Sequence, residues 1–281
     1  LMGNTYLTNK QTRRFILLKQ GLLGEHRFLG RQGVLDFIRQ AGCIQFDPVD
    51  VCGKNADIVL HSRVKGYTKS VLDALLYKDR LLIDYFDKNL SIFPVDDWKY
   101  FDCEREANRF LVKSRGRIEQ VFEEIKPVIH QKVYACSRDL QMSEKIDWYW
   151  GHTALARAAL ESLYYRGELV IHHKKGTVKF YSLAQDCLPY EILEAKNPCA
   201  TVEEYLEWRI LRRIGAVGLL WNRASDAWLG ISDFNTAARN KAFSRLLKQE
   251  KIAPLYVEGV EYPLYCLSPD LELIEAAQQD S

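Results

Sequence analysis

The 281-residue sequence lacks the features that mark membrane, secreted and zinc-binding proteins. It has no apolar run of about 18 residues and no basic segment leading into an apolar one, which argues against membrane insertion and secretion. Its seven cysteines form no CxxC pair and no cysteine–histidine cluster at zinc-site spacing. Because an odd count fits poorly with a closed disulfide framework, we expect buried free thiols. The predicted protein is cytosolic, without metal or cofactor.

A strong overall charge is also missing, since the net charge at pH 7 is only +2. Nucleic-acid affinity depends on where positive charge is concentrated, so local counts are more informative. Residues 105–138 contain eight Lys and Arg against four Glu, and residues 239–251 contain five against one. Residues 186–207 contain six acidic residues against one lysine. We therefore expect basic and acidic faces, although ordinary solvated helix surfaces would give the same counts.

One supersecondary pattern occurs three times: a helix with apolar periodicity leads into two β-rich stretches around a turn. Helix and strands lie at 68–77, 81–86 and 90–93; at 152–165, 168–173 and 177–183; and at 235–250, 252–257 and 260–267. Gly176 can supply the positive φ of the second turn, and Asn235 is a suitable cap for the third helix. Pro254 and Pro263 predict edge positions for the third pair of strands.

A helix followed by a hairpin and preceded by shorter helices is the winged-helix plan, a helix-turn-helix variant whose second helix can enter a DNA groove. Shorter helices are expected at 8–20, 31–41, 54–65, 104–113, 115–132, 201–214 and 225–230. We predict a mainly helical α+β fold of three tandem winged-helix units, residues 1–103, 104–190 and 191–281. Because winged helices also serve protein–protein contacts, a protein-binding scaffold is an alternative.

Chemistry is indicated at one place, the segment from Cys43 to Pro48 that follows a helix ending near Gly42. If this segment is extended, Gln45 and Asp47 project from one face, since strand side chains alternate. One amide and one carboxylate would then share a surface. A simpler alternative is that Asp47 caps the turn it makes with Pro48.

Several segments of the first unit carry a resemblance: Arg13-Arg14, Leu17, Gln20-Gly21-Leu22, Gln45-Phe46-Asp47, Leu60 to Arg63, Phe93-Pro94 and Trp98. They resemble the AlkZ/YcaQ-like bacterial DNA glycosylases, winged-helix proteins that act on alkylated and cross-linked DNA. The triplet is similar to the family's catalytic motif, a glutamine, an apolar residue, and an aspartate or glutamine. The resemblance implies that Gln45 and Asp47 are the catalytic pair, and the aspartate form points to the YcaQ-like branch.

The function implied is hydrolysis of the N-glycosidic bond of alkylated purines in double-stranded DNA by a monomer, with unhooking of interstrand cross-links. Cleavage passes through an oxocarbenium-like sugar, which a carboxylate can stabilise or serve by drawing a proton from water. Nothing separate indicates a lyase lysine, so we expect a monofunctional hydrolase, although Lys54 nearby leaves a lyase role open. The rival interpretation is a non-catalytic DNA-binding protein or transcriptional regulator.

Candidate DNA contacts are Arg14, Arg63 and Lys88 in the first unit, His172, Lys174 and Lys175 at the second wing, and Arg239, Lys241 and Arg245 on the third helix. Metal binding by His172 and His173 is not expected, because neighbouring strand residues point to opposite faces. Two features depart from the family. Lys88 stands where many relatives have histidine, which predicts altered lesion choice. Relatives also continue beyond the third unit, whereas this chain runs from Leu1 to Ser281, so we expect a fragment.

Overall fold

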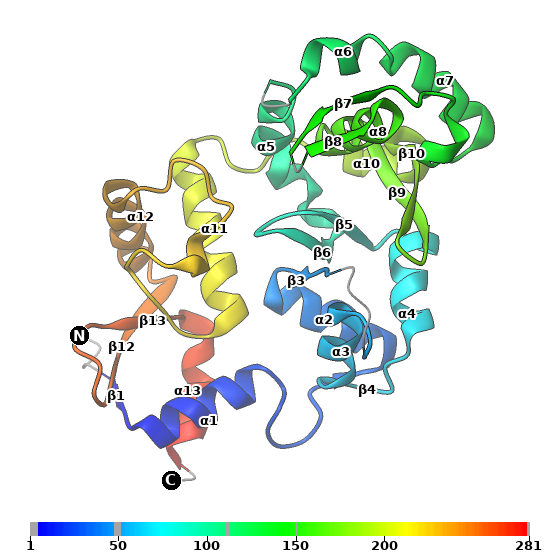
Figure 1. The fold of residues 1–281 in the computed structure, drawn as a ribbon. Coiled ribbons are helices and arrows are strands. Elements are labelled where there is room, and N and C mark those ends of the chain that lie inside the picture. The colour runs from blue at the N-terminus through cyan, green and yellow to red at the C-terminus, as the bar shows by residue number, and fades with distance from the viewer. Residues whose placement is uncertain (1–4, 48–51, 111–112, 150, 280–281) are drawn as a thin grey trace. The chain divides into compact units, whose positions relative to one another are not determined.

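The computed structural model describes residues 5–47, 52–110, 113–149 and 151–279 (Figure 1). The chain forms two compact units, each built from discontinuous segments. Unit 1 contains residues 1–72, 85–94 and 199–281, and unit 2 contains residues 73–84 and 95–198. The fold is mixed α and β, as predicted. The division into three tandem winged-helix units stays a prediction, and the contacts within the chain group its segments differently.

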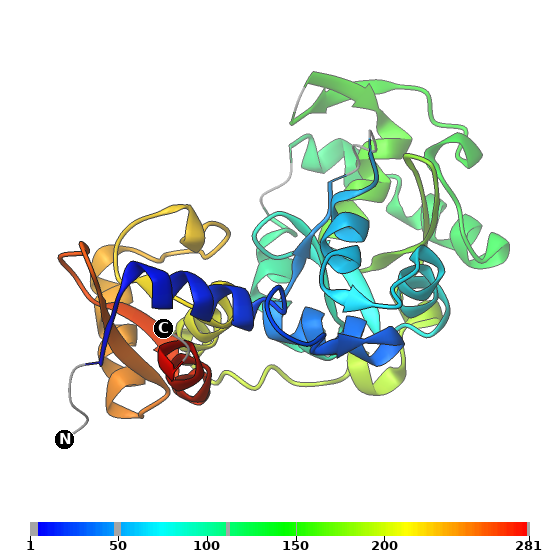
Figure 2. The same ribbon diagram turned by 90° about the horizontal axis from the view of Figure 1, so that it is seen from below.

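Unit 1 contains a four-stranded sheet with helices on both faces. Its strands, in spatial order, are β1 (Thr5–Leu7), β12 (Ile252–Val257), β13 (Leu264–Leu267) and β11 (Leu220–Trp221). The helices are α1 (Asn9–Lys19), α11 (Val202–Val217), α12 (Thr236–Lys248) and α13 (Leu271–Gln279). Leu255 and its neighbour Ala253 pack in one core with α1 and α13, whereas Ile252 packs in a second core with α11 and α12. Figures 1 and 2 both show α1 beside α13.

The position of Pro254 corrects one expectation. Strand β12 is an inner strand, because it pairs in parallel with β1 and antiparallel with β13. The pairing of β12 with β1 begins at Leu255, one residue after Pro254. Pro254, which has no N–H to donate, is therefore tolerated because it lies just outside the hydrogen bonds between β12 and β1. Pro263 lies just before β13, which is also an inner strand, so the edge prediction was wrong for both prolines.

The rest of unit 1 consists of short helices and strands, two of which cross the boundary, because residues 73–84 belong to unit 2. The helices are α2 (Gly30–Ala41), α3 (Asn55–His61) and α4 (Lys69–Asp73), the last continuing into a π-helical turn, Ala74–Lys78. The strands are β2 (Phe28–Leu29), β4 (Val64–Lys65), β3 (Ile44–Gln45), β5 (Leu82–Phe86) and β6 (Leu90–Pro94). Strands β2 and β4 pair in parallel, and a second sheet has the order β3-β6-β5. The predicted hairpin around residues 87–89 is confirmed.

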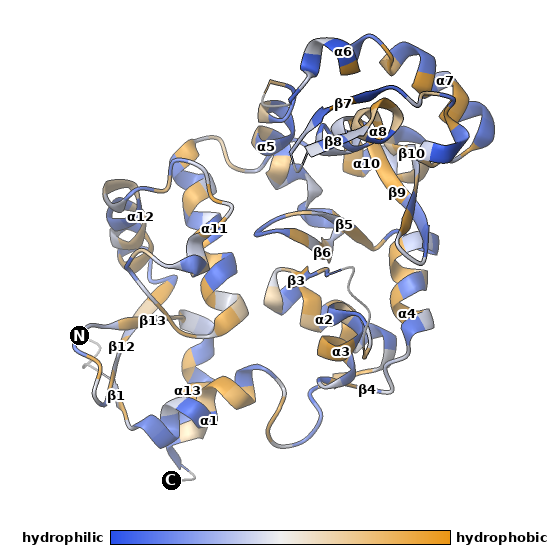
Figure 3. Ribbon diagram, in the orientation of Figure 1, coloured by the Kyte–Doolittle hydropathy of each residue, from blue (hydrophilic) through white to orange (hydrophobic). Residues whose placement is uncertain are grey.

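Unit 2 is built around the amphipathic helix α8 (Leu155–Tyr165), whose apolar face is buried. Its other helices are α5 (Asp102–Ala107), α6 (Arg115–Glu119), α7 (Phe122–Lys132), α9 (Ala184–Cys187) and α10 (Tyr190–Leu193). Its strands are β7 (Lys145–Trp148), β8 (Gly151–Ala154), β9 (Leu169–Lys175) and β10 (Val178–Leu183). Along β9 the hydropathy changes from apolar to polar toward the turn (Figure 3).

Several local predictions can be compared directly with the structure. Asn235 caps α12 by accepting a hydrogen bond from the N–H of Ala238 at 3.0 Å, and Gly176 has φ +58° in the second wing. The expected start of the second repeat's helix was wrong, because β8 occupies the first residues and pairs with β7. All seven cysteines are free, but Cys52 and Cys103 are exposed rather than buried. Among the described residues, no helix is long and apolar enough to cross a membrane.

Candidate functional site

The Gln45 segment is a short exposed strand on a buried support. Ile44 is buried and faces Ile92 of β6, whereas the next side chain, Gln45, is exposed. The N–H of Phe46 donates to the Leu90 carbonyl at 2.8 Å, and Asn55 Nδ2 donates to the Gln45 carbonyl at 3.1 Å. These two bonds hold the backbone that carries the Gln45 side chain. Asp47 follows the strand and is half-buried. Its predicted turn partner, Pro48, lies outside the described residues.

The turn between β5 and β6 lies next to this strand and holds a buried carboxylate. Asp87 Oδ1 is 2.7 Å from Arg213 and 3.0 Å from Arg209, and Oδ2 is 2.8 Å from Arg212 Nε. The Asp87 side chain is fully buried, and each guanidinium group is at least nine-tenths buried. Burial raises the pKa of the Asp87 carboxyl, but the three guanidinium groups outweigh that effect and hold it well below its usual range.

Arg212 of α11 joins this cluster to the Gln45 strand. Its Nε donates to Asp87 Oδ2 at 2.8 Å, and its Nη2 donates at 2.6 Å to the carbonyl of Gly42, two residues before β3. Gly42 has φ +72°, and a Cβ there would lie 2.6 Å from Arg212 Cγ. Only glycine fits this close approach without displacing the arginine. The family-like triplet is therefore held by a residue that is about 170 positions away in the sequence.

A cleft of about 540 Å³ lies beside the same segment, along α3. It is lined in part by Gly53, Lys54, Ile58, Tyr67 and Lys69, all in unit 1. Lys54 Nζ is 5.9 Å from the centroid of the Phe46 ring, within the triplet. The Tyr67 hydroxyl donates to Asp57, another lining residue. This cleft was not predicted from the sequence, because it depends on how the helix expected there packs against the residues on either side of it.

The second wing, formed by β9 and β10, differs from a regular hairpin. His173 pairs with Phe180, but Tyr181 pairs with Ile171, so His172 is an extra residue in a β-bulge. The two imidazoles consequently meet, with their Nδ1 atoms 2.8 Å apart, and our expectation of opposite faces was wrong. His173 stacks on Phe180 at 4.5 Å between ring centroids. Among the described residues, no cluster of three or more His, Cys, Asp or Glu is placed to hold a metal ion.

The cations of this wing are in different environments. Lys175 is exposed, with Nζ 5.5 Å from the centroid of the Phe180 ring. Lys174 forms a buried ion pair with Asp84, and both side chains are less than one-tenth exposed. Because breaking that pair would leave a buried carboxylate without its partner, Lys174 is poorly placed to bind phosphate. Burial lowers the pKa of His172, and the positive charge of Arg80 and the adjoining His173 lower it further.

Two of the three basic residues predicted on the helix of the third repeat, now α12, are bound to acidic residues of α11. Lys241 Nζ is 2.9 Å from Glu203, and Arg245 forms an ion pair with the buried Glu207. Arg239 is itself buried and donates to Asn222 Oδ1 at 3.0 Å. Part of the positive segment 239–251 and part of the acidic segment 186–207 thus neutralise one another. Of the four basic residues on α12, two are paired with carboxylates and a third is buried.

The three predicted contacts of the first unit also differ in availability. Arg14 and Lys88 are half-buried, and Lys88 lies in the turn beside Asp87. Arg63 stacks over Phe37, 5.4 Å from the ring centroid, and donates to the Ser62 hydroxyl at 2.7 Å. Burial lowers the pKa of Arg63. Lys88 lies in the hairpin whose strand β6 pairs with the candidate catalytic strand β3.

Comparisons with known proteins agree with this architecture. The sequence profile of the DNA glycosylase AlkZ-like family matches residues 38–281, which include Gln45 and Asp47. The chain belongs to the AlkZ-like DNA glycosylase family. Among solved structures, Streptomyces sahachiroi DNA glycosylase AlkZ has a similar fold, with a TM-score of 0.64 and 16% sequence identity over 97% of this chain and 73% of that one. No curated protein matches the sequence.

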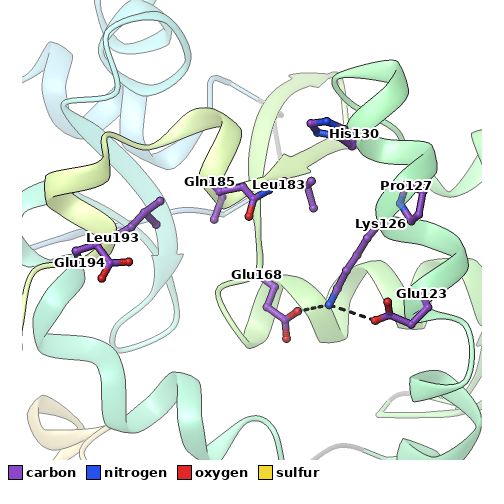
Figure 4. Close-up of a pocket in the computed structure, with 10 residues that line it drawn as sticks. Glu123, Lys126, Pro127, His130, Glu168, Leu183, Gln185, Leu193 and Glu194 are labelled. Carbon is purple, nitrogen blue, oxygen red and sulfur yellow. Dashed lines mark ion pairs between the residues drawn. The ribbon is translucent and has the colours of Figure 1, made fainter.

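A second cleft, of about 510 Å³, lies in unit 2 of this AlkZ-like chain (Figure 4). Lys126 points between two carboxylates in the figure, with Nζ 2.7 Å from Glu168 and 3.8 Å from Glu123. Glu194 also lines the cleft, and His130 binds Asp186 at 3.0 Å. The excess of carboxylates makes this cleft unfavourable for phosphate. In contrast, the cleft along α3 adjoins the triplet that resembles the family's catalytic motif.

Proposed function

We propose that this chain hydrolyses the N-glycosidic bond of N3- or N7-alkylated purines in double-stranded DNA, with Gln45 and Asp47 as the catalytic residues. The observation that carries the proposal is an exposed amide on a rigid strand, followed two residues later by a carboxylate, in a member of a DNA glycosylase family. The Asp87–arginine cluster and Asn55 support the backbone around this pair.

In the proposed reaction, the bond between C1′ and the base nitrogen breaks, and its electron pair leaves with the base. An alkylated purine is cationic, so it departs neutral and needs no general acid. The Asp47 carboxylate stabilises the oxocarbenium-like sugar and accepts a proton from the attacking water. The Gln45 amide orients that water. The oxygen of the water then bonds to C1′, leaving an abasic deoxyribose.

The same chemistry extends to interstrand cross-links. In such a cross-link, a linker alkylates one purine on each strand, so both bases are cationic. Hydrolysis at one of the two sugars then separates the strands. We propose a monofunctional, monomeric hydrolase, in which water rather than an amine attacks C1′. Lys88 and Lys175 are proposed to contact phosphate, because neither ammonium forms an ion pair with a residue that the structure describes.

The direct test measures release of N7-methylguanine from a duplex containing one such base. Wild-type protein should release the base and leave strands that break only after alkali treatment. Asp47→Asn should lower the rate by about 10²–10⁴-fold, the usual contribution of a general base. Its affinity for uncleaved duplex should remain nearly unchanged.

Asp36→Asn is the matched control, because Asp36 is an exposed carboxylate on α2 outside the proposed site. It should release base at the wild-type rate. Duplex binding by the wild type without base release would favour a non-catalytic regulator. Full activity in Asp47→Asn would remove Asp47 from the mechanism, and strand breaks before alkali treatment would contradict monofunctional hydrolysis.

A further inference from the structure

Strand β11, at one edge of the four-stranded sheet of unit 1, exposes a tryptophan. The strand pairs with β13, where Trp221 lies opposite Leu264, and its other side is the edge of the sheet. Trp221 is 37% exposed, and it is the only exposed tryptophan among those that the structure describes. Its ring meets that of Tyr262 at an angle of 66°, with 5.8 Å between the ring centroids. The two rings together offer aromatic surface to a ligand.

Arg223 adds a cation to this surface. Its Cζ lies over the Tyr262 ring, 4.3 Å from the centroid. The side chain is exposed and forms no ion pair with any other residue in the described part of the chain. Stacking covers one face of the guanidinium group, so its N–H donors remain available to an anion. Trp221, Arg223 and Tyr262 form the aromatic edge of unit 1.

Hydrogen bonds to α12 and to a buried indole fix the backbone of the aromatic edge. Asn222 Oδ1 accepts from Arg239 Nε at 3.0 Å, and Asn222 Nδ2 donates to Asn240 Oδ1 at 2.8 Å. The carbonyl of Arg223 accepts from Nε1 of the buried Trp228 at 2.8 Å. Arg239, a predicted DNA contact, therefore supports the aromatic edge in the structure. A ligand would meet a preformed surface, which lowers the entropic cost of binding.

The chemistry of the aromatic edge fits unpaired nucleotides better than a duplex. In a duplex, neighbouring base pairs cover both faces of each base, whereas an unpaired base can stack on an aromatic side chain. The exposed donors of Arg223 can bind the phosphate that adjoins such a base. Stacking of this kind needs no particular base, because every base has an aromatic face.

We infer that the aromatic edge binds single-stranded DNA next to the duplex that carries the lesion, with a base on Trp221 and a phosphate at Arg223. The inference rests on the proposed function, which supplies DNA as the ligand, and it bears on cross-links in particular. A cross-link prevents strand separation, so separating strands stop there and leave single-stranded DNA beside the linked purines. Affinity for that single strand would direct the protein to the cross-links that block strand separation.

The test compares a blunt duplex with the same duplex carrying a single-stranded tail of about ten nucleotides, a usual length for single-strand sites. In fluorescence anisotropy, the wild type should bind the tailed duplex about tenfold more tightly, equivalent to about 1.4 kcal/mol. Trp221→Ala and Arg223→Ala should each remove most of this preference and leave the affinity for the blunt duplex nearly unchanged. The tail should also quench tryptophan fluorescence. Trp221→Phe, which keeps an aromatic ring, should lose the quenching and retain the preference.

Tyr6→Ala and Lys248→Ala are matched controls, and both should keep the preference for the tail. Tyr6 is 66% exposed on β1, at the other edge of the same sheet, and Lys248 is an exposed cation at the end of α12. Equal affinity of the wild type for the two duplexes would overturn the inference, as would a preference that persists in Trp221→Ala and Arg223→Ala. Base release from the blunt duplex would then still support the proposed function. A preference that depends on Trp221, without base release by the wild type, would instead support the aromatic edge and refute the glycosylase activity.

Discussion

Asp87 is the carboxylate on which the local structure of the candidate site depends most. It compensates three buried guanidinium groups, one of which also holds the Gly42 carbonyl before the Gln45 strand. A buried ion pair is not necessarily stabilising compared with apolar packing, but removing one partner is costly, since the remaining charge stays buried without compensation. Here the loss of one carboxylate would leave three positive charges together.

Asp87→Asn should therefore lower the free energy of unfolding by about 3–5 kcal/mol, measured by urea denaturation at neutral pH. The asparagine keeps the shape but removes the negative charge. Asp36→Asn, which changes an exposed carboxylate, should alter the free energy by less than about 0.5 kcal/mol. Equal stability of the two variants would show that the cluster does not depend on the charge of Asp87.

At the scale of elements, the stability of the second wing, the hairpin of β9 and β10, depends on pH through the two imidazoles at its bulge. Burial lowers the pKa of each: Arg80 and then His173 lower that of His172 further, and Lys175 and then Arg80 lower that of His173 further. Just below the ordinary histidine pKa of 6.5, both imidazoles therefore bind protons in the unfolded chain but not in the folded wing. The stabilisation from neutral imidazoles is complete above that value and decreases as pH falls through the lowered pKa values.

The expected result is that the double variant His172→Gln/His173→Gln loses part of the decrease in stability between pH 7.5 and pH 5. Thermal unfolding of the wild type and the variant at both pH values measures this difference. His26→Gln, a substitution of an exposed histidine in unit 1, should keep the wild-type dependence. The same pH dependence in the wild type and the double variant would exclude the wing as its source.

The hairpins illustrate what the sequence could predict at this scale. Apolar periodicity and turn residues placed β9, β10 and the turn at Gly176 within a few residues, because those signals are local. The bulge at His172 was not predictable, since it depends on which residues of two strands pair. Pro254 misled for a similar reason: whether β12 is an inner strand depends on a partner, β1, nearly 250 residues away.

The candidate site shows the same limit. Gln45 and Asp47 were predicted by resemblance of a local triplet, and the exposure of Gln45 beside the buried Ile44 agrees with the predicted alternation. The role of Arg212 in holding this strand was not predicted, because a distant helix supplies it. Charge counts failed for α12, since a one-dimensional count cannot show that Glu203 and Glu207 lie opposite the helix's cations.

For the whole molecule, this internal neutralisation changes the expected strength of DNA binding. If all eight Lys and Arg residues predicted from the sequence contacted phosphate, the logarithm of the binding constant would fall with the logarithm of salt concentration with a slope of about −7. We instead propose that four lysines contact phosphate: Lys54, Lys69, Lys88 and Lys175. Four such contacts would give a slope of about −4.

Fluorescence anisotropy with an undamaged duplex between 50 and 200 mM salt would measure this slope. Lys175→Ala should reduce it by about 1, because one phosphate contact is lost. Lys241→Ala should leave it unchanged or make it slightly steeper, since Glu203 then loses its partner and repels the duplex. A slope near −7 that Lys241→Ala reduces would mean that α12 exchanges its internal ion pairs for phosphate contacts. In that case, the third helix contributes directly to DNA binding, as the sequence alone predicted.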